Sequence, residues 1–223
     1  MEINAWHDIF KFTNIVLFSM EKRDVISSIL FLTVSIALIF VNRNIRTHGF
    51  REFIYKEAVF YLLVPVILLI IAKRDPRKYG LALGDKRKIK KYFAILFLAA
   101  IPFMLIGASM REFQIYYPRF YFSNTMEFIY WELLVGLLML STEFFYRGFM
   151  LFGLKRTGRF SIIIQAVPYA LVHLGKPMVE VYYSFFAGVA FGYIDMESKS
   201  ILPSFLLHWS TSIIFDSLCV LLS

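Results

Sequence analysis

The sequence is poor in cysteine and histidine, the residues that form disulfides and bind transition metals. It has one cysteine, Cys219, in 223 residues, which excludes an internal disulfide and a cysteine-based metal site. Cys219 lies in an apolar run and is interpreted as a packing residue. Only four histidines occur, and none is part of a His-Glu-x-x-His sequence, the spacing that places two zinc ligands and a base on one helix face. The N-terminus lacks the pattern of a removable signal peptide, so none is expected.

Apolar residues, by contrast, dominate the chain. Hydrophobic residues make up 59% of it, aromatic residues 18%, and the mean hydropathy is +0.64. These values lie outside the range of soluble globular proteins and are typical of proteins that cross a membrane several times. The predicted fold is therefore all-α, a polytopic membrane helical bundle that forms one domain over residues 1–223.

Seven apolar segments are predicted to be transmembrane helices. A further apolar stretch, residues 5–20, is short and interrupted by His7 and Asp8, so an interfacial helix within residues 1–24 is expected. If that stretch also crosses, the number of spans becomes eight. Asn124 and Glu127 are spaced to cap the fourth predicted helix. The seven segments are residues 25–41, 58–72, 92–109, 128–154, 160–174, 180–194 and 201–222.

Basic residues predict the orientation. The formal net charge is +8, but the Lys and Arg residues fall mainly between the apolar segments, which favours anionic lipid over nucleic acid as the partner. With seven spans, 16 of the 24 Lys and Arg residues lie on one side of the membrane. Nine of them lie in residues 73–91, so this basic loop is assigned to the cytoplasm. We expect a multi-pass protein of the cell membrane, most simply a bacterial cytoplasmic membrane.

One predicted helix carries two opposite charges. Glu143 and Arg147 lie four residues apart in segment 128–154, hence on one helix face, where their charges can pair. Ionised side chains are costly in a hydrocarbon core, so an intramembrane Glu indicates a functional site. A structural ion pair without a further role is the alternative.

Two histidines are predicted at a similar depth. At about 1.5 Å of rise per residue, Glu143 lies roughly 18 Å from the cytoplasmic end of its helix. His173 lies about 20 Å and His208 about 12 Å from the same side. Three ionisable side chains from three segments therefore fall in one layer, which indicates a shared polar site.

Such a set supports amide hydrolysis. A carboxylate beside an imidazole can take a proton from water, and a second imidazole can donate to the oxyanion that forms on a peptide carbonyl. Two histidines and a carboxylate are also a zinc ligand set. Because the His-Glu-x-x-His spacing is missing, zinc is the second interpretation, and no metal or cofactor is predicted.

These residues resemble the motifs of a known family, the CAAX prenyl protease and bacteriocin-processing (Abi) family of glutamate intramembrane proteases. Glu143 to Arg147 and Gly148 resembles its first motif, EExxxR. Tyr169 to His173 resembles the second, FxxxH, and His208 to Ser212 the third, HxxxN. Order and spacing both fit across residues 125–220, which carry all three motifs.

The resemblance implies a role for each residue. Glu143 with His173 would activate water, His208 with Ser212 would hold the oxyanion, and Arg147 would orient Glu143. The sequence departs from the pattern at three positions. Thr142 replaces the first Glu, which usually acts as general base, Tyr169 replaces Phe, and Ser212 replaces Asn. If Thr142 removes the base, the protein is an inactive relative.

The expected function is therefore an intramembrane endopeptidase that cleaves a membrane-associated protein or peptide. The family suggests prenylated CAAX tails, bacteriocin leader peptides or C-terminal sorting tails as substrates. The alternative is a non-enzymatic membrane protein, either a bacteriocin-immunity factor or a transporter whose intramembrane charges form a proton or substrate path. A transporter is expected to show inverted repeats or paired broken helices, and the sequence has neither.

Overall fold

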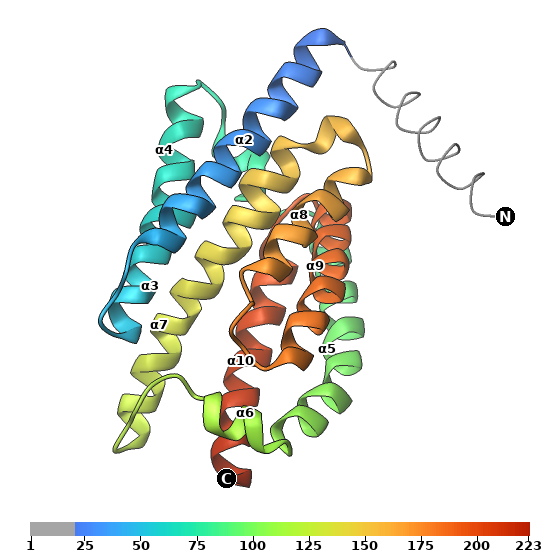
Figure 1. Ribbon diagram of the computed structural model, residues 1–223. Helices are drawn as coiled ribbons and strands as arrows, with labels where there is room; N and C mark the ends of the chain where they lie inside the picture. The colour runs from blue at the N-terminus through green and yellow to red at the C-terminus, as the bar shows by residue number, and fades with distance from the viewer. Residues whose placement is uncertain (1–20) are drawn as a thin grey trace, which may run out of the picture.

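The computed structural model describes residues 21–223, which form a bundle of helices (Figure 1). The nearest approach to a strand in this part of the chain is one isolated bridge between Leu174 and Lys176. The predicted all-α class is therefore confirmed. The interfacial helix predicted for residues 5–20 lies outside the described residues.

The helices agree with the predicted segments to within a few residues, except that two begin earlier: α5 starts at Lys86 and not at residue 92, and the second apolar helix also starts early. The second apolar helix begins at Phe50 rather than at residue 58, because the charged turns before the apolar run are also helical. In chain order the elements are α2 (Lys22–Asn44), α3 (Phe50–Ala58), the π-helix η1 (Val59–Leu63), α4 (Val64–Ile71), the 3-10 turn η2 (Pro76–Tyr79), α5 (Lys86–Ala108), α6 (Arg111–Tyr116), α7 (Thr125–Glu143), the π-helix η3 (Phe144–Leu151), the 3-10 turn η4 (Lys155–Thr157), α8 (Phe160–Leu171), α9 (Met178–Ser198) and α10 (Leu202–Leu222).

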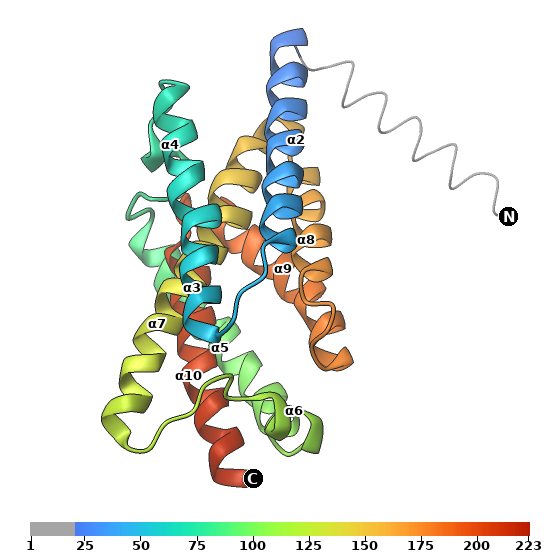
Figure 2. The same cartoon turned by 60° about the vertical axis from the view of Figure 1, so that its left-hand side comes forward.

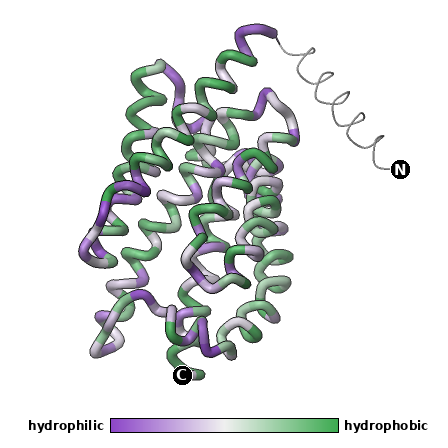
Figure 3. Tube along the Cα trace, in the orientation of Figure 1, coloured by the Kyte–Doolittle hydropathy of each residue, from purple (hydrophilic) through white to green (hydrophobic). Residues whose placement is uncertain are grey.

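Five of the described helices are long and apolar enough to cross a membrane: α2, the continuous helix Phe50–Ile71, α5, Thr125–Leu151 and α10. Helix α8 has 12 residues and so rises only about 18 Å, less than the roughly 30 Å of a hydrocarbon core. Helix α9 has 21 residues but carries acidic residues near both ends. Figure 3 shows hydrophobic residues along the helices and hydrophilic ones concentrated in the connections. Outward-facing Phe40 and Ile71 are about 70% exposed, as expected for side chains that contact lipid.

The connections that were predicted to share one side of the membrane meet in the structure. Asp24, before the first apolar run, pairs with Arg156 at 3.6 Å. The backbone N–H of Ile201 donates to the carbonyl of Gly80 at 3.0 Å, which joins the 195–200 connection to the basic loop. Six of the twelve residues that line a cavity of about 400 Å³ at this end are basic: Arg23, Lys73, Arg74, Lys78, Lys155 and Arg156.

Helix α7 begins at the predicted cap. The side-chain oxygen of Asn124 accepts a hydrogen bond from the backbone N–H of Glu127 at 3.0 Å, and the Glu127 carboxylate accepts one from the N–H of Ser123 at 2.7 Å. These bonds satisfy amide groups that the first turn of a helix leaves without partners. Helix α7 then runs through the middle of the bundle, with α2, α3 and α4 on one side and α8, α9 and α10 on the other (Figures 1 and 2).

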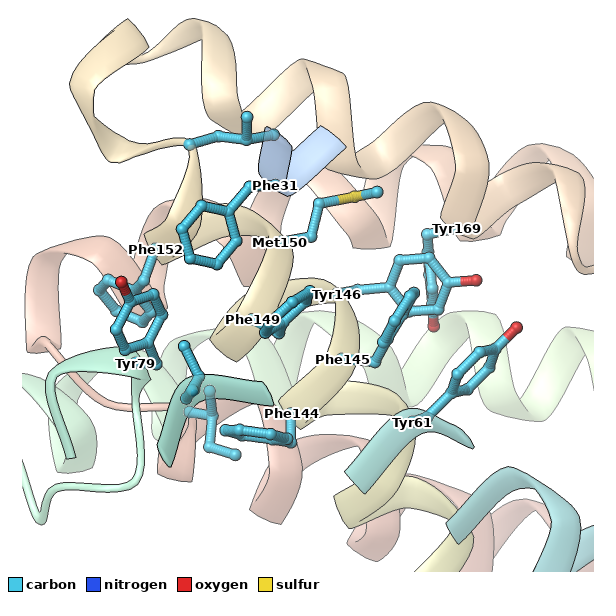
Figure 4. Close-up of a cluster of buried hydrophobic side chains, with 13 residues drawn as sticks. Phe31, Tyr61, Tyr79, Phe144, Phe145, Tyr146, Phe149, Met150, Phe152 and Tyr169 are labelled. Carbon is cyan, nitrogen blue, oxygen red and sulfur yellow. The ribbon is translucent and has the colours of Figure 1, made fainter. Parts of the chain in front are cut away.

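The π-helix η3 forms the centre of the hydrophobic core, and every residue in it is buried. Figure 4 shows this core, with Phe31 and Tyr79 near one end and Tyr61 and Tyr169 near the other. Tyr61 of the second π-helix, η1, stacks on Phe145 with 4.3 Å between ring centroids. π-Helical turns are rare and often occur at functional sites. Here the π-helix η3 includes most of the first sequence motif.

A stripe of small residues brings α8 close to α9. A Cβ atom added to Gly188 would lie 3.1 Å from the Tyr169 ring and 3.2 Å from Ala166, and one added to Gly192 would contact the Gln165 amide. Gln165 also donates to the carbonyl of Gly188 at 2.8 Å. Close packing at these glycines therefore fixes where the end of α8 lies.

Candidate active site

The candidate site is built around Glu143, the last residue of α7. Its side chain has no solvent exposure, and its Oε2 atom lies 3.2 Å from Nε of Arg147, which is also fully buried. The two residues were predicted to pair from their spacing, and this contact is confirmed. The pair forms at the point where α-helical turns change to π-helical ones.

The second oxygen of Glu143 is bound by a histidine from another helix. His208 of α10 lies with its Nδ1 atom 2.6 Å from Oε1 of Glu143. The residues are 65 positions apart in sequence. The short distance is typical of a charge-assisted hydrogen bond. The structure thus brings together two of the three side chains that were predicted at one depth.

Arg147 is also held by aromatic rings. Its guanidinium carbon lies 3.8 Å from the centroid of the Tyr169 ring and 5.4 Å from that of Phe191. A guanidinium over a ring face gains electrostatic energy, most strongly where water is excluded. Tyr169, which replaces the Phe of the second motif, therefore contacts Arg147 directly.

His173 lies in a turn and not on the predicted helix, because α8 ends at Leu171. The turn is completed by Gly175 at φ +96°, a conformation that side chains other than glycine rarely adopt. The Nδ1 atom of His173 lies 2.7 Å from the carbonyl oxygen of Tyr169, and the ring packs against the Tyr169 ring at 4.7 Å.

The carboxylate nearest to His173 is Glu180 of α9. Nε2 of His173 lies 4.0 Å from Oε1 of Glu180, whereas both oxygens of Glu143 face Arg147 and His208. The imidazoles of His173 and His208 are nevertheless near enough to interact electrostatically. The site thus has two adjoining parts, one around Glu143 and one around His173, with Tyr169 between them.

Thr142 and Ser212, the other predicted site residues, are near Glu143 and His208 along their own helices. The Thr142 hydroxyl donates to the carbonyl of Leu138 in its own helix at 2.9 Å. Ser212 lies one turn after His208 on α10 and is partly buried. The catalytic roles assigned to these residues, and to Glu143, His173 and His208, remain predictions.

Several polar residues of the site were not found by sequence reasoning. Asp195 was expected in a connection, but α9 continues to Ser198 and buries Asp195 completely. The hydroxyl of Ser204 donates to Asp195 at 2.5 Å and also lies beside Glu143. Ser204 lies one turn before His208 on the same helix. This spacing is the one feature of the sequence that points to Ser204 as a site residue. Glu180 gave no signal beyond an acidic residue near a helix start.

A pair of carboxyl groups lies outside this site. Glu132 of α7 and Asp216 of α10 are each 4% exposed, and their side chains face each other. Trp209 donates to the backbone carbonyl of Glu132 at 2.9 Å, so the pair is part of the contact between α7 and α10. Within residues 21–223, no group of three His, Cys, Asp or Glu side chains is arranged to hold a metal ion.

Apolar helices around buried charged and imidazole groups define a helical membrane protein with an intramembrane polar site. Residues 124–214 match the family model described as type II CAAX prenyl endopeptidase Rce1-like. This segment includes all three motifs, so the resemblance to the CAAX protease family is confirmed over it. The match supports a membrane protein that is a peptide hydrolase. No curated protein and no solved structure matches the chain.

Proposed function

We propose that the protein is an intramembrane endopeptidase that hydrolyses a peptide bond in a membrane-associated protein or peptide. The observation that carries the proposal is the buried contact between Glu143 and His208 at 2.6 Å, inside the segment that matches the protease family. The non-enzymatic alternatives have no comparable support, since no described feature points to an immunity factor or a transport path.

His208 is suited to stabilise the oxyanion. A carboxylate bound at Nδ1 holds the imidazole in one orientation and leaves Nε2 to act on the substrate. A proton on Nε2 can be donated to the oxygen of a tetrahedral intermediate. Ser212, one turn further along α10, would supply a second donor through its hydroxyl.

Glu143 in this proposal orients His208 and does not touch the attacking water. Both of its oxygens are engaged, one by His208 and one by Arg147, and its side chain has no exposed surface. This differs from the role that the resemblance implies for Glu143. Arg147 keeps its expected orienting role, because it balances the charge of Glu143 and is fixed in turn by Tyr169.

His173 is the proposed base. A backbone carbonyl only accepts hydrogen bonds, so the Nδ1 atom that lies 2.7 Å from Tyr169 O must carry the proton. The neutral ring then has its lone pair on Nε2, where it can remove a proton from water. Thr142, which replaces the family's first Glu, is not needed for this step.

The protein is further proposed to be a multi-pass protein of the cell membrane. Its basic loop, residues 73–91, would lie in the cytoplasm, with α8 as a short helix that does not cross the bilayer completely. Substrates would be delivered by the membrane, with prenylated CAAX tails as the first class to test because of the family match.

The proposal is tested with the purified protein in detergent micelles. The probes are three synthetic peptides: one with a prenylated CAAX tail, one with a bacteriocin leader and one with a C-terminal sorting tail, and products are identified by mass spectrometry. His208→Ala is expected to lower kcat by about 10²–10³, the usual effect of losing an oxyanion donor. His48→Ala, in an exposed loop, is the matched control and should cleave like the wild type. A wild type that cleaves none of the probes, or a fully active His208→Ala, would contradict the proposal.

A further inference from the structure

We infer that Glu180 is the carboxylate that holds the attacking water together with His173. The inference rests on the proposed peptidase function and adds a catalytic residue outside the three motifs. It starts from the lack of a carboxylate for the water at the motif positions. Thr142 replaces the first Glu, and its hydroxyl is directed back to Leu138, while Glu143 is fully buried with its oxygens against His208 and Arg147. Among residues 21–223, the only carboxylate within 4.0 Å of a His173 ring nitrogen is that of Glu180.

The distance between the two groups fits one water molecule. Nε2 of His173 and Oε1 of Glu180 are 4.0 Å apart, too far for a direct hydrogen bond. A water oxygen about 2.8 Å from each atom would see them at an angle of about 90°, close to the angle between its own two O–H bonds. One water can therefore donate one proton to Nε2 and the other to Oε1. Its remaining lone pairs then point away from both, toward a substrate carbonyl.

Glu180 is held in place by two donors from different segments. The Tyr117 hydroxyl lies 2.8 and 2.9 Å from its two oxygens, and Nζ of Lys176 lies 2.6 Å from Oε1. Burial raises the pKa of the Tyr117 phenol well above its ordinary value, and the charge of Glu180 raises it further. Tyr117 therefore stays protonated and remains a donor. These bonds fix the carboxylate before substrate binds.

His173 and Glu180 have different roles in the attack by water. The lone pair on Nε2 makes His173 the group that receives the proton, and the Glu180 carboxylate accepts the second hydrogen bond of the water and orients it. The side chains of His173 and Glu180 are 10% and 17% exposed, so the site is enclosed but water can reach it.

The proposed step is balanced. The water oxygen forms a bond to the peptide carbonyl carbon, one water proton moves to Nε2 of His173, and the carbonyl electron pair becomes the oxyanion. When the C–N bond breaks, the oxyanion closes to a carbonyl again and the proton on His173 passes to the leaving amine. Hydrolysis consumes one water and leaves both protein groups in their starting states.

Glu180 also has a purely structural interpretation, as a tether between α9 and the 110–124 segment. The experiment separates the two by comparing Glu180→Gln with Glu197→Gln. Glu197 is near the other end of α9 and forms a similar ion pair, with Lys88 at 2.9 Å. Both variants keep the shape of the side chain and remove its charge.

We expect Glu180→Gln to lower kcat by about 10²–10⁴ with KM nearly unchanged, the usual contribution of a positioned acid–base group. Glu197→Gln should keep wild-type kcat, and thermal melting in micelles should show similar small shifts for both variants. A wild-type kcat in folded Glu180→Gln would overturn the inference. If Glu180→Gln does not fold, Glu180→Asp is used, which keeps the charge but withdraws it by one methylene. A kcat at least tenfold lower is then expected, and an unchanged kcat would overturn the inference.

The outcome also distinguishes this inference from the proposed function. If His208→Ala loses cleavage and Glu180→Gln retains it, the protein is a peptidase and Glu180 is a tether. If the wild type cleaves none of the peptide probes, the proposed function itself fails, and the role of Glu180 fails with it.

Discussion

Glu143 and Arg147 form an ion pair at 3.2 Å in which neither side chain has any exposed surface. The pair lies at the junction of α7 and the π-helix η3, the most deeply buried segment of the bundle. Charges in such a place must be compensated by partners, because removing each of them from water costs several kcal/mol. The partners found are His208 for the carboxylate and the Tyr169 ring for the guanidinium. The ion pair is thus part of a larger polar unit that joins η3, α8 and α10.

Breaking this pair is expected to be strongly destabilising. Arg147→Met leaves the Glu143 carboxylate buried beside His208 alone, and the expected loss is about 3–5 kcal/mol in the free energy of unfolding. Thermal or denaturant unfolding in micelles measures it. The double variant Arg147→Met with Glu143→Gln should be less destabilised than the sum of the two single variants, because no unpaired charge remains. Strict additivity would show that the two residues do not interact energetically.

Gly148, the last residue of the first motif, is predicted to tolerate no side chain. A Cβ atom there would lie 2.7 Å from the backbone carbonyl oxygen of Tyr79 and closer still to the Phe144 ring. We expect Gly148→Ala to lower the free energy of unfolding by about 1–3 kcal/mol, the range for overpacked cores. Gly49→Ala is the control, since nothing lies within 4 Å of a Cβ at that position. Equal melting temperatures for the two variants would contradict this packing.

Ser204 is predicted to support the site through Asp195. Its hydroxyl donates to the fully buried Asp195, so Ser204→Ala leaves an acidic group without that donor and should cost about 1–3 kcal/mol. Ser217→Ala, whose hydroxyl bonds only to the carbonyl of Ile213 in the same helix, should change stability little. Melting curves of the two variants, recorded side by side, test the difference. A Ser204→Ala protein as stable as Ser217→Ala would rule out the supporting role.

The proposed orientation can be measured by labelling engineered cysteines in intact cells. The single native thiol, Cys219, is fully buried and gives a low background. Lys86→Cys lies in the basic loop, whereas Tyr121→Cys lies on the opposite side at a position that is 99% exposed. A membrane-impermeant maleimide should label Tyr121→Cys in intact cells and Lys86→Cys only after the cells are opened. The reverse labelling pattern would show that the protein has the opposite orientation in the membrane.

Sequence reasoning was most successful for the positions of the helices, which the bilayer constrains. A helix that crosses lipid needs a long apolar run with few charges, so hydropathy located the helices to within a few residues, apart from the early starts at Phe50 and Lys86. The pairing of Glu143 with Arg147 also followed from sequence, because residues four apart share one face of a helix. The Asn124 cap was predicted by a similarly local rule.

Other features depended on how the helices end and turn. His173 was expected on a helix near Glu143, but α8 ends at Leu171, and the turn through Gly175 directs the imidazole toward Glu180. Asp195 was expected in a connection, because charged residues usually mark span ends, yet it is buried beside Ser204. Hydropathy records how apolar a segment is and not which way each helix is rotated, so it gives no information on these partners.

The positions of the apolar helices along the chain were therefore determined by the sequence itself, since the length and polarity of a segment decide whether it can lie in a bilayer. The identity of each partner was decided only by the tertiary structure. Packing of α8 against the glycines of α9, and of α10 against α7, fixes the rotation of the helices and thereby places His208 on Glu143 and His173 near Glu180. Hydrogen bonds act over about 3 Å, and only packing positions side chains that closely.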